Sequence, residues 1–324
     1  MPDDHILLAL EFDGKGQGTP LSGEAISEAI KSKKLAWVHL DATQPETRNW
    51  LEREVSYLDP YITEALLADE TRPRMTQIGD GVLLILRGVN LNKDAAPEDM
   101  VSIRLWIDSH RIISVRRRQL KAVWDIEKLL REGHGPKNSG EFLSLLTAQL
   151  FARMEPTITG LDDNTDDIEE KLLENLDSSL RERIVQIRKK AIILRRYMSP
   201  QRDAVSQLRM ADIHWMHEKN KRHLQESVNI VTRYVEDLDA IRERAQIVKD
   251  ELANILSERL NKNMYVLSVI AAIFLPLGFL TGLLGINVGG IPGTDNDYAF
   301  WIVNGLLITV VTLQVWLFKK LGWF

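Results

Sequence analysis

The stretch NMYVLSVIAAIFLPLGFLTGLLGINVGGIPGT, residues 263–294, decides the fold of the C-terminal part of this chain. It has no charged residue in 32 positions, and Tyr298 to Phe318 has none in 21. An α-helix needs roughly 20 residues to cross about 30 Å of hydrocarbon, so both stretches are long enough to span a membrane. The glycines and the proline at the end of the first stretch, within 285–293, predict a turn before the second. We therefore expect two transmembrane helices, over 263–285 and 298–318, joined by a loop over 286–297.

The charges beside these spans predict their orientation. Arg259 and Lys262 precede the first span and Lys319 and Lys320 follow the second, whereas the loop carries acids and no bases. Segments rich in Lys and Arg stay in the cytoplasm, so we expect the loop outside and both termini inside, with residues 319–324 as a short cytoplasmic tail.

The overall composition excludes several classes of protein. The 324 residues are 44% hydrophobic and 27% charged, include no cysteine and carry a net charge of −5. Without cysteine there are no disulfides or thiolate metal sites. The negative charge argues against a nucleic-acid partner. The acidic N-terminus lacks a long apolar core, so no cleavable signal peptide is expected. We find no phosphate-binding loop, nucleophile motif or pair of catalytic carboxylates, so no enzyme is predicted.

Residues 1–135 predict a cytoplasmic α/β domain with a mixed sheet. Short β-rich runs alternate with helix-like segments at 45–55 and 59–70. The expected strands are 6–12, 35–41, 75–78, 82–89, 101–108 and 111–117. The turn-rich GHGPKNSG, 133–140, marks the end of this domain.

Residues 136–262 predict a cytoplasmic region of long helices, because no glycine occurs between Gly160 and Gly278. We expect one break at Ser199-Pro200 and a weaker one near ADIHWMHE, 211–218. A helix from about 218 to 284 would then be roughly 100 Å long at 1.5 Å per residue. Its cytoplasmic part is amphipathic, and we expect it to pack against copies of itself around a central axis.

The C-terminal layout resembles that of the CorA family of divalent-cation transporters. The matching features are a stalk helix that enters the membrane, Gly285-Ile286-Asn287 at its outer end, a short loop, a second span and a terminal Lys-Lys. Ile286 stands where the magnesium channels have Met, and with VGGIPG, 288–293, this resembles the zinc-transporter branch. The upstream stretches that fit the same branch are WVHLDATQPETRNWL (37–51), DETRPRM (69–75), LILRGVNLN (84–92), EDMVSIRLWID (98–108), ISVRRR (113–118) and MSPQRDAVSQL (198–208).

The resemblance implies a funnel-shaped homopentamer in the bacterial inner membrane, so that the loop 286–297 is periplasmic. The first spans would line one central pore and the second spans would face lipid. Zn²⁺ would be the transported substrate, with no tightly bound cofactor, and Gly285, Ile286 and Asn287 would form the selectivity filter. The partners would be other copies of the chain, the lipid bilayer and divalent metal ions.

One face of the first span has the residues expected of a pore lining. Steps of three and four back from Asn287 give Gly282, Gly278, Leu275, Ala271, Ser268, Met264 and Asn261. Small residues also permit close helix packing, which stays open as an alternative. The second span is bulkier, as suits a lipid-facing helix, and its Asn304 and Gln314 are expected to bond neighbouring helices. Pro276 predicts a bend, either a gating hinge or a passive kink.

The first span also lacks chemistry that other transporters use. Zinc binds His, Cys or carboxylate ligands, and none occurs between residues 263 and 294. We therefore expect the ion to pass largely hydrated, with the Asn287 side chains and nearby carbonyls holding its water shell. Proton relays usually need intramembrane Asp, Glu or His, so any proton dependence would act at the outer mouth, on the cytoplasmic domain or through pore water.

Two cytoplasmic clusters have more than one interpretation. The acidic segment DDNTDDIEEKLLENLD, 162–177, is either a solvated face or, against basic side chains of the long helix, a sensor or buffer of cations. Asp212, His214, His217 and His223 are zinc-type ligands, but their spacing matches no tight motif and solvated histidines are the commoner case. A magnesium channel of the same family and a membrane-anchored metal sensor without transport are the alternative functions.

Asp295 and Asp297 of the outer loop are either solvated turn residues or a ring that attracts cations to the pore mouth. If they attract cations, the double variant Asp295→Asn/Asp297→Asn lowers cation uptake at low ionic strength and much less at high ionic strength, because salt screens the attraction. Uptake in vesicles at the two salt concentrations measures this. An equal loss at both concentrations contradicts the attraction.

Overall fold

The computed structural model describes residues 4–174, 178–286, 293 and 296–322. The chain separates into two compact units, Met1–Lys249 and Asp250–Phe324. Helix α8, Glu218–Leu284, contributes residues to both units. The finer division of the first unit at residue 135 stays a prediction.

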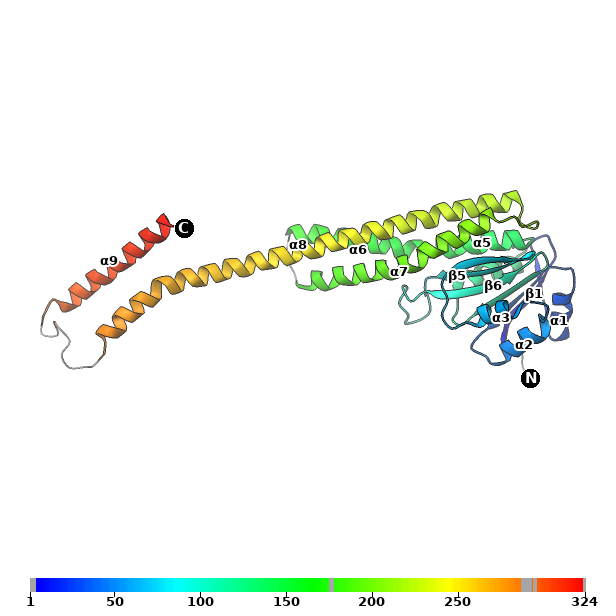
Figure 1. Ribbon diagram of the computed structural model, residues 1–324, viewed down its shortest axis with the longest axis horizontal. Coiled ribbons are helices and arrows are strands. Elements are labelled where there is room, and N and C mark those ends of the chain that lie inside the picture. Colours follow the sequence, from blue (N-terminus) through cyan, green and yellow to red (C-terminus); the bar gives the residue numbers. More distant parts are fainter. Residues whose placement is uncertain (1–3, 175–177, 287–292, 294–295, 323–324) are drawn as a thin grey trace. The chain divides into compact units, whose positions relative to one another are not determined.

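The first unit is built on one mixed sheet of seven strands (Figure 1). All six expected strands are confirmed, and a short strand that the pattern did not predict, β2 (Gly18–Pro20), pairs with β1 at the edge. The central pair β3 and β7 is parallel and every other pairing is antiparallel. The strand order is β2-β1-β3-β7-β6-β5-β4, with β1 Ile6–Phe12, β3 Ala36–Asp41, β4 Arg74–Ile78, β5 Gly81–Gly88, β6 Val101–Ile107 and β7 Arg111–Arg116.

Helices cover both faces of this sheet, which explains why β3 reads as a continuous apolar run. Val38 packs into a core with helices α1 (Glu24–Lys31), α2 (Glu46–Glu54) and α3 (Pro60–Leu67). The neighbouring Trp37 points to the other face, where its ring lies 4.9 Å from that of Phe142 in α5 (Ser139–Ala152). Successive strand residues face opposite sides, so a strand with helices on both sides has no polar face. Helix α4, Lys121–Arg131, packs beside α5.

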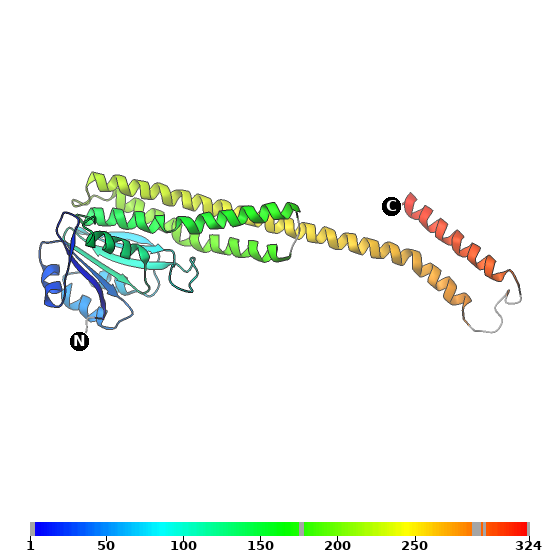
Figure 2. The ribbon, with the colours of Figure 1, turned by 180° about the vertical axis from the view of Figure 1, so that it is seen from behind.

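Long helices form the rest of the first unit (Figure 2). They are α6 (Glu155–Glu174), α7 (Ser178–Met210) and the first part of α8. In α8 the buried positions recur every seven residues, at 224, 231, 238 and 245 and again at 227, 234, 241 and 248. This is the heptad pattern of coiled-coil packing. The Tyr234 hydroxyl lies 3.4 Å from the Phe151 carbonyl oxygen of α5, so the stripe packs inside its own chain. Helices of the same chain therefore cover this stripe, and the expected packing of α8 against copies of itself stays a prediction.

One of the two expected helix breaks is wrong. Pro200 lies inside α7, which continues to Met210. The next residue, Gln201, is fully buried and exchanges two hydrogen bonds with the backbone of Arg87, accepting at 2.6 Å and donating at 2.9 Å. Packing against the end of β5 therefore favours a helix here despite the proline.

The second break, near 211–218, is confirmed. Residues 211–217 are non-helical, and Trp215 donates a 2.7 Å hydrogen bond from Nε1 to the carbonyl oxygen of Asp80 in the β4–β5 turn. Ile213 and Met216 are buried with it. The turn between α7 and α8 is thus anchored to the sheet by its apolar residues.

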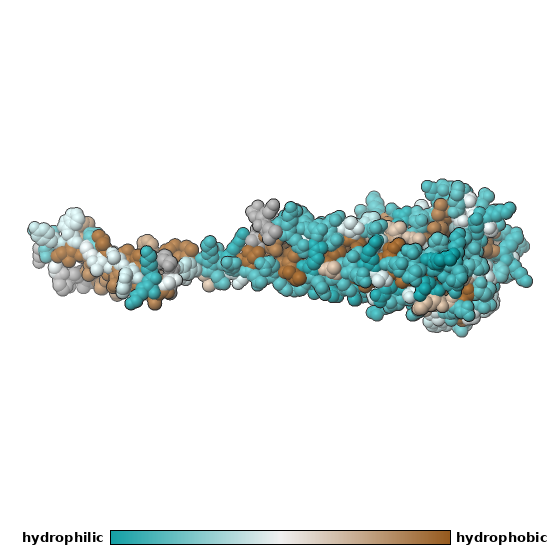
Figure 3. All heavy atoms as spheres, turned by 90° about the horizontal axis from the view of Figure 1, so that it is seen from above, coloured by the Kyte–Doolittle hydropathy of each residue, from teal (hydrophilic) through white to brown (hydrophobic). Residues whose placement is uncertain are grey.

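The second unit holds the end of α8 and helix α9, Ala299–Lys320. Both helices are long and apolar enough to cross a membrane, as expected. In the space-filling view, brown apolar side chains gather on these helices, whereas the visible face of the first unit is mostly teal (Figure 3).

Two glycine substitutions test this packing with opposite expected signs. A Cβ atom at Gly81 would lie 2.2 Å from Cζ2 of Trp106, whereas one at Gly160 in α6 meets nothing within 4 Å. Gly81→Ala is therefore expected to lower the free energy of unfolding by about 1–3 kcal/mol, the usual cost of overpacking. Gly160→Ala is expected to raise it by about 0.5–1 kcal/mol, because alanine favours the helix. Thermal unfolding of the first unit in the detergent-solubilised chain measures both; equal effects would contradict the packing.

Candidate ion-conduction pathway

The membrane-length part of α8 and helix α9 bury almost none of their apolar side chains fully within a single chain. No residue of α9 is buried, and Val269 is the one buried residue described between 263 and 286. Exposed side chains include Leu275 at 71% and Phe279 at 69%. Apolar surface of this extent requires lipid, other protein chains or both as its surroundings.

The two helices touch on one side of α8. Gln314 of α9 donates from Nε2 to the carbonyl oxygen of Ala272 at 3.3 Å, which confirms its expected bond to a neighbouring helix. Asn304 donates from Nδ2 to the Phe300 carbonyl oxygen within α9 at 2.8 Å, and its expected bond to a neighbouring helix stays a prediction. An apolar cleft of about 510 Å³ lies between the helices, lined by Phe274, Leu277, Gly278, Thr281, Leu307, Ile308, Val311 and Thr312.

The residues predicted to line a pore share a largely uncovered face of α8. Ala271 is half-buried and the other six are exposed: Asn261, Met264, Ser268, Leu275, Gly278 and Gly282. A Cβ atom added at Gly278 or Gly282 would meet nothing within 4 Å, although Gly278 also borders the cleft beside α9. The face is therefore free to meet water or another helix. Its role as a pore lining stays a prediction.

The expected filter begins where α8 ends. The Gly285 N–H donates to the carbonyl oxygens of Thr281 and Gly282, at 2.9 and 3.2 Å, and closes the last turn. Ile286 follows as an exposed residue at 47%. Asn287, the residue with the polar side chain, lies outside the described residues. The structure thus places two of the three filter residues at a helix end and leaves their role untested.

The expected outer acids fall beside the start of α9. Asp297 is exposed, and Asp295 lies outside the described residues. Between them, Asn296 accepts a 2.9 Å hydrogen bond at Oδ1 from the Tyr298 N–H and fixes the entry into α9. Attraction of cations by the two acids remains a prediction.

Pro276 lies inside α8 without ending it. The orange C-terminal part of α8, which contains this residue, curves in both ribbon views (Figures 1 and 2). The expected bend is consistent with this curvature, because proline removes one helical hydrogen bond.

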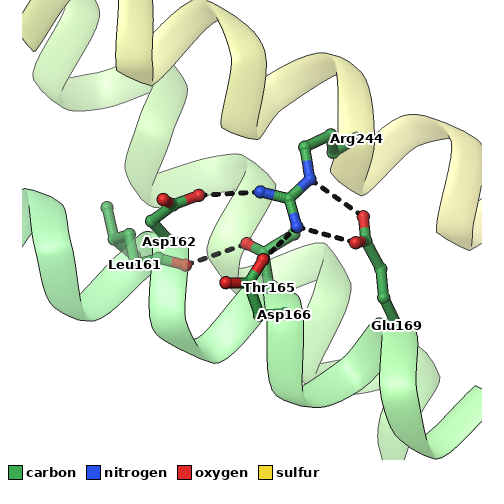
Figure 4. Close-up of polar contacts among 6 residues, drawn as sticks. All are labelled: Leu161, Asp162, Thr165, Asp166, Glu169 and Arg244. Atoms are coloured by element: carbon green, nitrogen blue, oxygen red, sulfur yellow. Dashed lines mark hydrogen bonds and ion pairs between the residues drawn. The ribbon is translucent and has the colours of Figure 1, made fainter.

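The acidic segment of α6 faces a basic side chain of α8, as one of its two interpretations required (Figure 4). Arg244 donates from Nη1 to Asp162 at 2.8 Å and from Nε to Glu169 at 3.0 Å, and its Nη2 contacts Asp166. These hydrogen bonds, that to Glu169 foremost and then that to Asp166, raise the pKa of Arg244 above its usual value. The three carboxylates therefore serve as ion-pair partners that join α6 to α8.

The four candidate cytoplasmic metal ligands are not brought together. His214 Nδ1 lies 3.8 Å from Asp80, and Asp212 accepts a hydrogen bond from Gln77 through its backbone. His217 and His223 are exposed. Among all described residues, no three His, Asp or Glu side chains form a group that could hold a metal ion. A metal site on these residues is therefore not supported within one chain.

Sequence reasoning missed a second charged region, a cavity at the ends of β5, β6 and β7 that is lined by six arginines. In the sequence, the run of three basic residues at 116–118 is the one indication of this cavity, and such a run is equally typical of a solvated strand end.

Comparison with known proteins identifies the family. The family model described as CorA-like Mg²⁺ transporter protein matches residues 32–320. The chain belongs to the CorA-like transporter family. The expected resemblance is therefore confirmed, and the family consists of divalent-cation transporters rather than enzymes.

Relatives share nearly the full length of this family member. It is 38% identical over 315 residues to the zinc transport protein ZntB of Pectobacterium carotovorum subsp. carotovorum strain PC1, covering 97% of this chain and 95% of that one. It is 39% identical over 322 residues to the divalent cation transporter CmaX of Pseudomonas aeruginosa PAO1, covering 98% and 96%. The solved structure of full-length CmaX matches with a TM-score of 0.87 at 37% identity, over 100% of this chain and 99% of that one.

The absence of cysteine allows a direct test of the exposed face of α8. Ser268→Cys is expected to react with a charged, membrane-impermeant thiol reagent, because a pore-lining residue meets water. Ile308→Cys on α9 is the matched control; it is 66% exposed in the single chain, and if it faces lipid it stays unlabelled. Labelling in intact vesicles, read by mass spectrometry, distinguishes the two positions. Reaction at both or at neither contradicts the assigned pore face.

Proposed function

We propose that this protein is a zinc transporter of the bacterial inner membrane, in which copies of the chain assemble as a homopentamer around one pore. The uncovered face of α8 carries this proposal, because it combines small and polar residues with no partner in a single chain. Packed around an axis, five such faces would enclose a narrow pathway. The bulkier α9 then meets lipid.

Zinc is proposed as the cargo on the strength of similarity. Relatives 34–38% identical carry the name zinc transport protein ZntB. The similarly close CmaX is named for divalent cations in general, and the family model is named for Mg²⁺. Magnesium is therefore the second candidate.

The proposed mechanism moves the ion with its water shell. Residues 263–294 contain no His, Asp or Glu, so the pathway offers no strong ligand for a bare zinc ion. Amide and carbonyl oxygens at Gly285, Ile286 and Asn287 bond the water shell instead and let the ion leave again. Leu275 and Met264 supply an apolar constriction between the polar ends, Asn261 and Asn287. Any proton dependence enters outside this span.

The orientation follows from the flanking charges. Lys319 and Lys320 at the end of α9 and Lys262 before the first span place both helix ends on the cytoplasmic side. The first unit then lies in the cytoplasm, and Asp297 lies at the periplasmic mouth.

Flux through the purified protein in liposomes tests the function. We expect wild-type protein to carry Zn²⁺, measured with an entrapped fluorescent indicator, with and without a pH gradient and with Mg²⁺ in parallel. Asn287→Ala should lower the flux several-fold, because it removes the proposed side-chain ligand of the water shell. Asn304→Ala is the matched control and should leave flux unchanged, since Asn304 lies on α9 and donates to Phe300 of the same helix.

The outcomes separate the candidates. Mg²⁺ flux without Zn²⁺ flux selects the magnesium channel. No flux of either ion, from protein that is folded and inserted, selects the membrane-anchored sensor. Equal effects of Asn287→Ala and Asn304→Ala contradict the filter.

A further inference from the structure

A cavity of about 870 Å³ lies in the first unit, and none of its lining residues belongs to α8 or α9. Its walls come from the loop before β4, the end of β5, the start of β6, the residues after β7 and one side of α7. Segments distant in sequence thus meet at one end of the sheet. The volume falls in the range of small-molecule sites.

Arg104 is the unusual residue of this cavity. It lies on β6 and is only 1% exposed. Within the described part of the chain its Nε and Nη1 atoms have no hydrogen-bond partner, and Nη2 makes one long contact of 3.4 Å to the Asp69 carbonyl oxygen. A buried charged group whose donors are left without hydrogen-bond partners costs several kcal/mol, so its presence requires an explanation.

Two neighbouring arginines increase this cost. Burial, followed by the positive charges of Arg117 and Arg87, lowers the pKa of Arg104 to about 10. The Arg87 guanidinium donates its hydrogen bonds to neutral groups, the carbonyl oxygens of Thr71 and Met100, at 2.8–3.1 Å. Arg117 donates to the Leu67 carbonyl oxygen and pairs with the carboxylate of Asp69, which is 85% exposed. Solvent weakens that pair.

The charges around the cavity do not cancel. The lining includes an excess of two positive charges, from Arg72, Arg87, Arg104, Arg117, Arg118 and Arg196 against Asp69, Glu70, Glu98 and Asp99. Glu98 also has a partner outside the lining, Lys190, at 3.6 Å. The acids present therefore leave the arginines short of negative charge.

The far wall of the cavity is suited to hold a ligand against the sheet. The ring of Tyr197 in α7 contacts two guanidinium groups, with Arg87 4.3 Å and Arg196 4.9 Å from its ring centre. Arg196 is exposed and donates from Nη2 to the Tyr197 hydroxyl at 3.0 Å, whereas Arg104 is buried. An anion entering from solvent would therefore meet the exposed Arg196 first and the buried Arg104 deeper in the cavity.

We propose that this cavity binds a small oxyanion of the phosphate class, held between the buried Arg104 at its base and Arg196 at its mouth. Planar guanidinium groups match the geometry of phosphate oxygens, and hydrogen bonds between charged groups are about twice as strong as neutral ones. The bound anion compensates the buried charge and ties α7 to the ends of the strands. The site is separate from the proposed pore and does not depend on the transported ion.

Calorimetric titration of the full-length protein with inorganic phosphate tests the proposal. Wild type is expected to bind phosphate and to unfold at a higher temperature in sodium phosphate than in sodium chloride of equal ionic strength. Arg104→Met should weaken phosphate binding by about tenfold or more, the effect of losing one charged hydrogen-bond partner. Its own phosphate-free unfolding temperature should stay the same or rise, because methionine removes an uncompensated buried charge.

Two further variants keep the test decisive. Arg131→Met is the matched control, since Arg131 lies outside the cavity, is 53% exposed and pairs with Glu127; it should bind phosphate as wild type does. Arg196→Gln changes an exposed residue of the cavity and should weaken binding even if Arg104→Met fails to fold. The proposal is overturned if phosphate and chloride act alike on wild type, or if Arg196→Gln and Arg131→Met bind phosphate equally well.

Discussion

A single uninterrupted helix, α8, imposes the main constraint on this protein. The helix is 67 residues long. Its first part packs in the core of the first unit, and its last part is apolar enough to cross a membrane. An α-helix pairs its backbone N–H and C=O groups internally, so it can continue from a protein core into a membrane without a break. Each part must then meet its surroundings through side chains only. The heptad stripe at 224–248 is buried by helices of the same chain, whereas Val269 is the one buried residue among those described from 263 onward.

The charged groups of the first unit are arranged in two contrasting ways. Arg244 is exposed enough to remain partly solvated and still meets three carboxylates, so α6 and α8 are joined by a pair network whose energy depends on salt. Arg104 is almost fully buried and meets no carboxylate among the described residues. The first arrangement is complete within one chain, and the second is not. The donors of Arg244 have hydrogen-bond partners and most of those of Arg104 do not. This difference, rather than the number of charges, suggests that the arginine-lined cavity binds a ligand.

The periodicity of apolar residues and the length of apolar segments predicted most helices and strands correctly. Errors arose where tertiary packing overrode a local sequence preference. The six strands and the start of α8 at Glu218 follow from alternation and from the turn residues at 211–217. Pro200 signals a break, yet the buried Gln201 keeps the helix intact through two bonds to the β5 backbone. The amphipathic stripe of α8 indicates a partner but does not say which, and α5 to α7 of the same chain supply it.

The sequence by itself determined the two membrane-length helices, the mixed sheet and the family, because hydrophobic length, periodicity and the motif after Leu284 are properties of consecutive residues. It also determined that the first span lacks zinc ligands, since composition needs no coordinates. Only the tertiary structure decided which charges meet: Arg244 reaches carboxylates 75 to 82 residues away, and the cavity around Arg104 collects side chains from five separate segments. Such contacts depend on how strands and helices pack, and spacing along the chain carries no record of them.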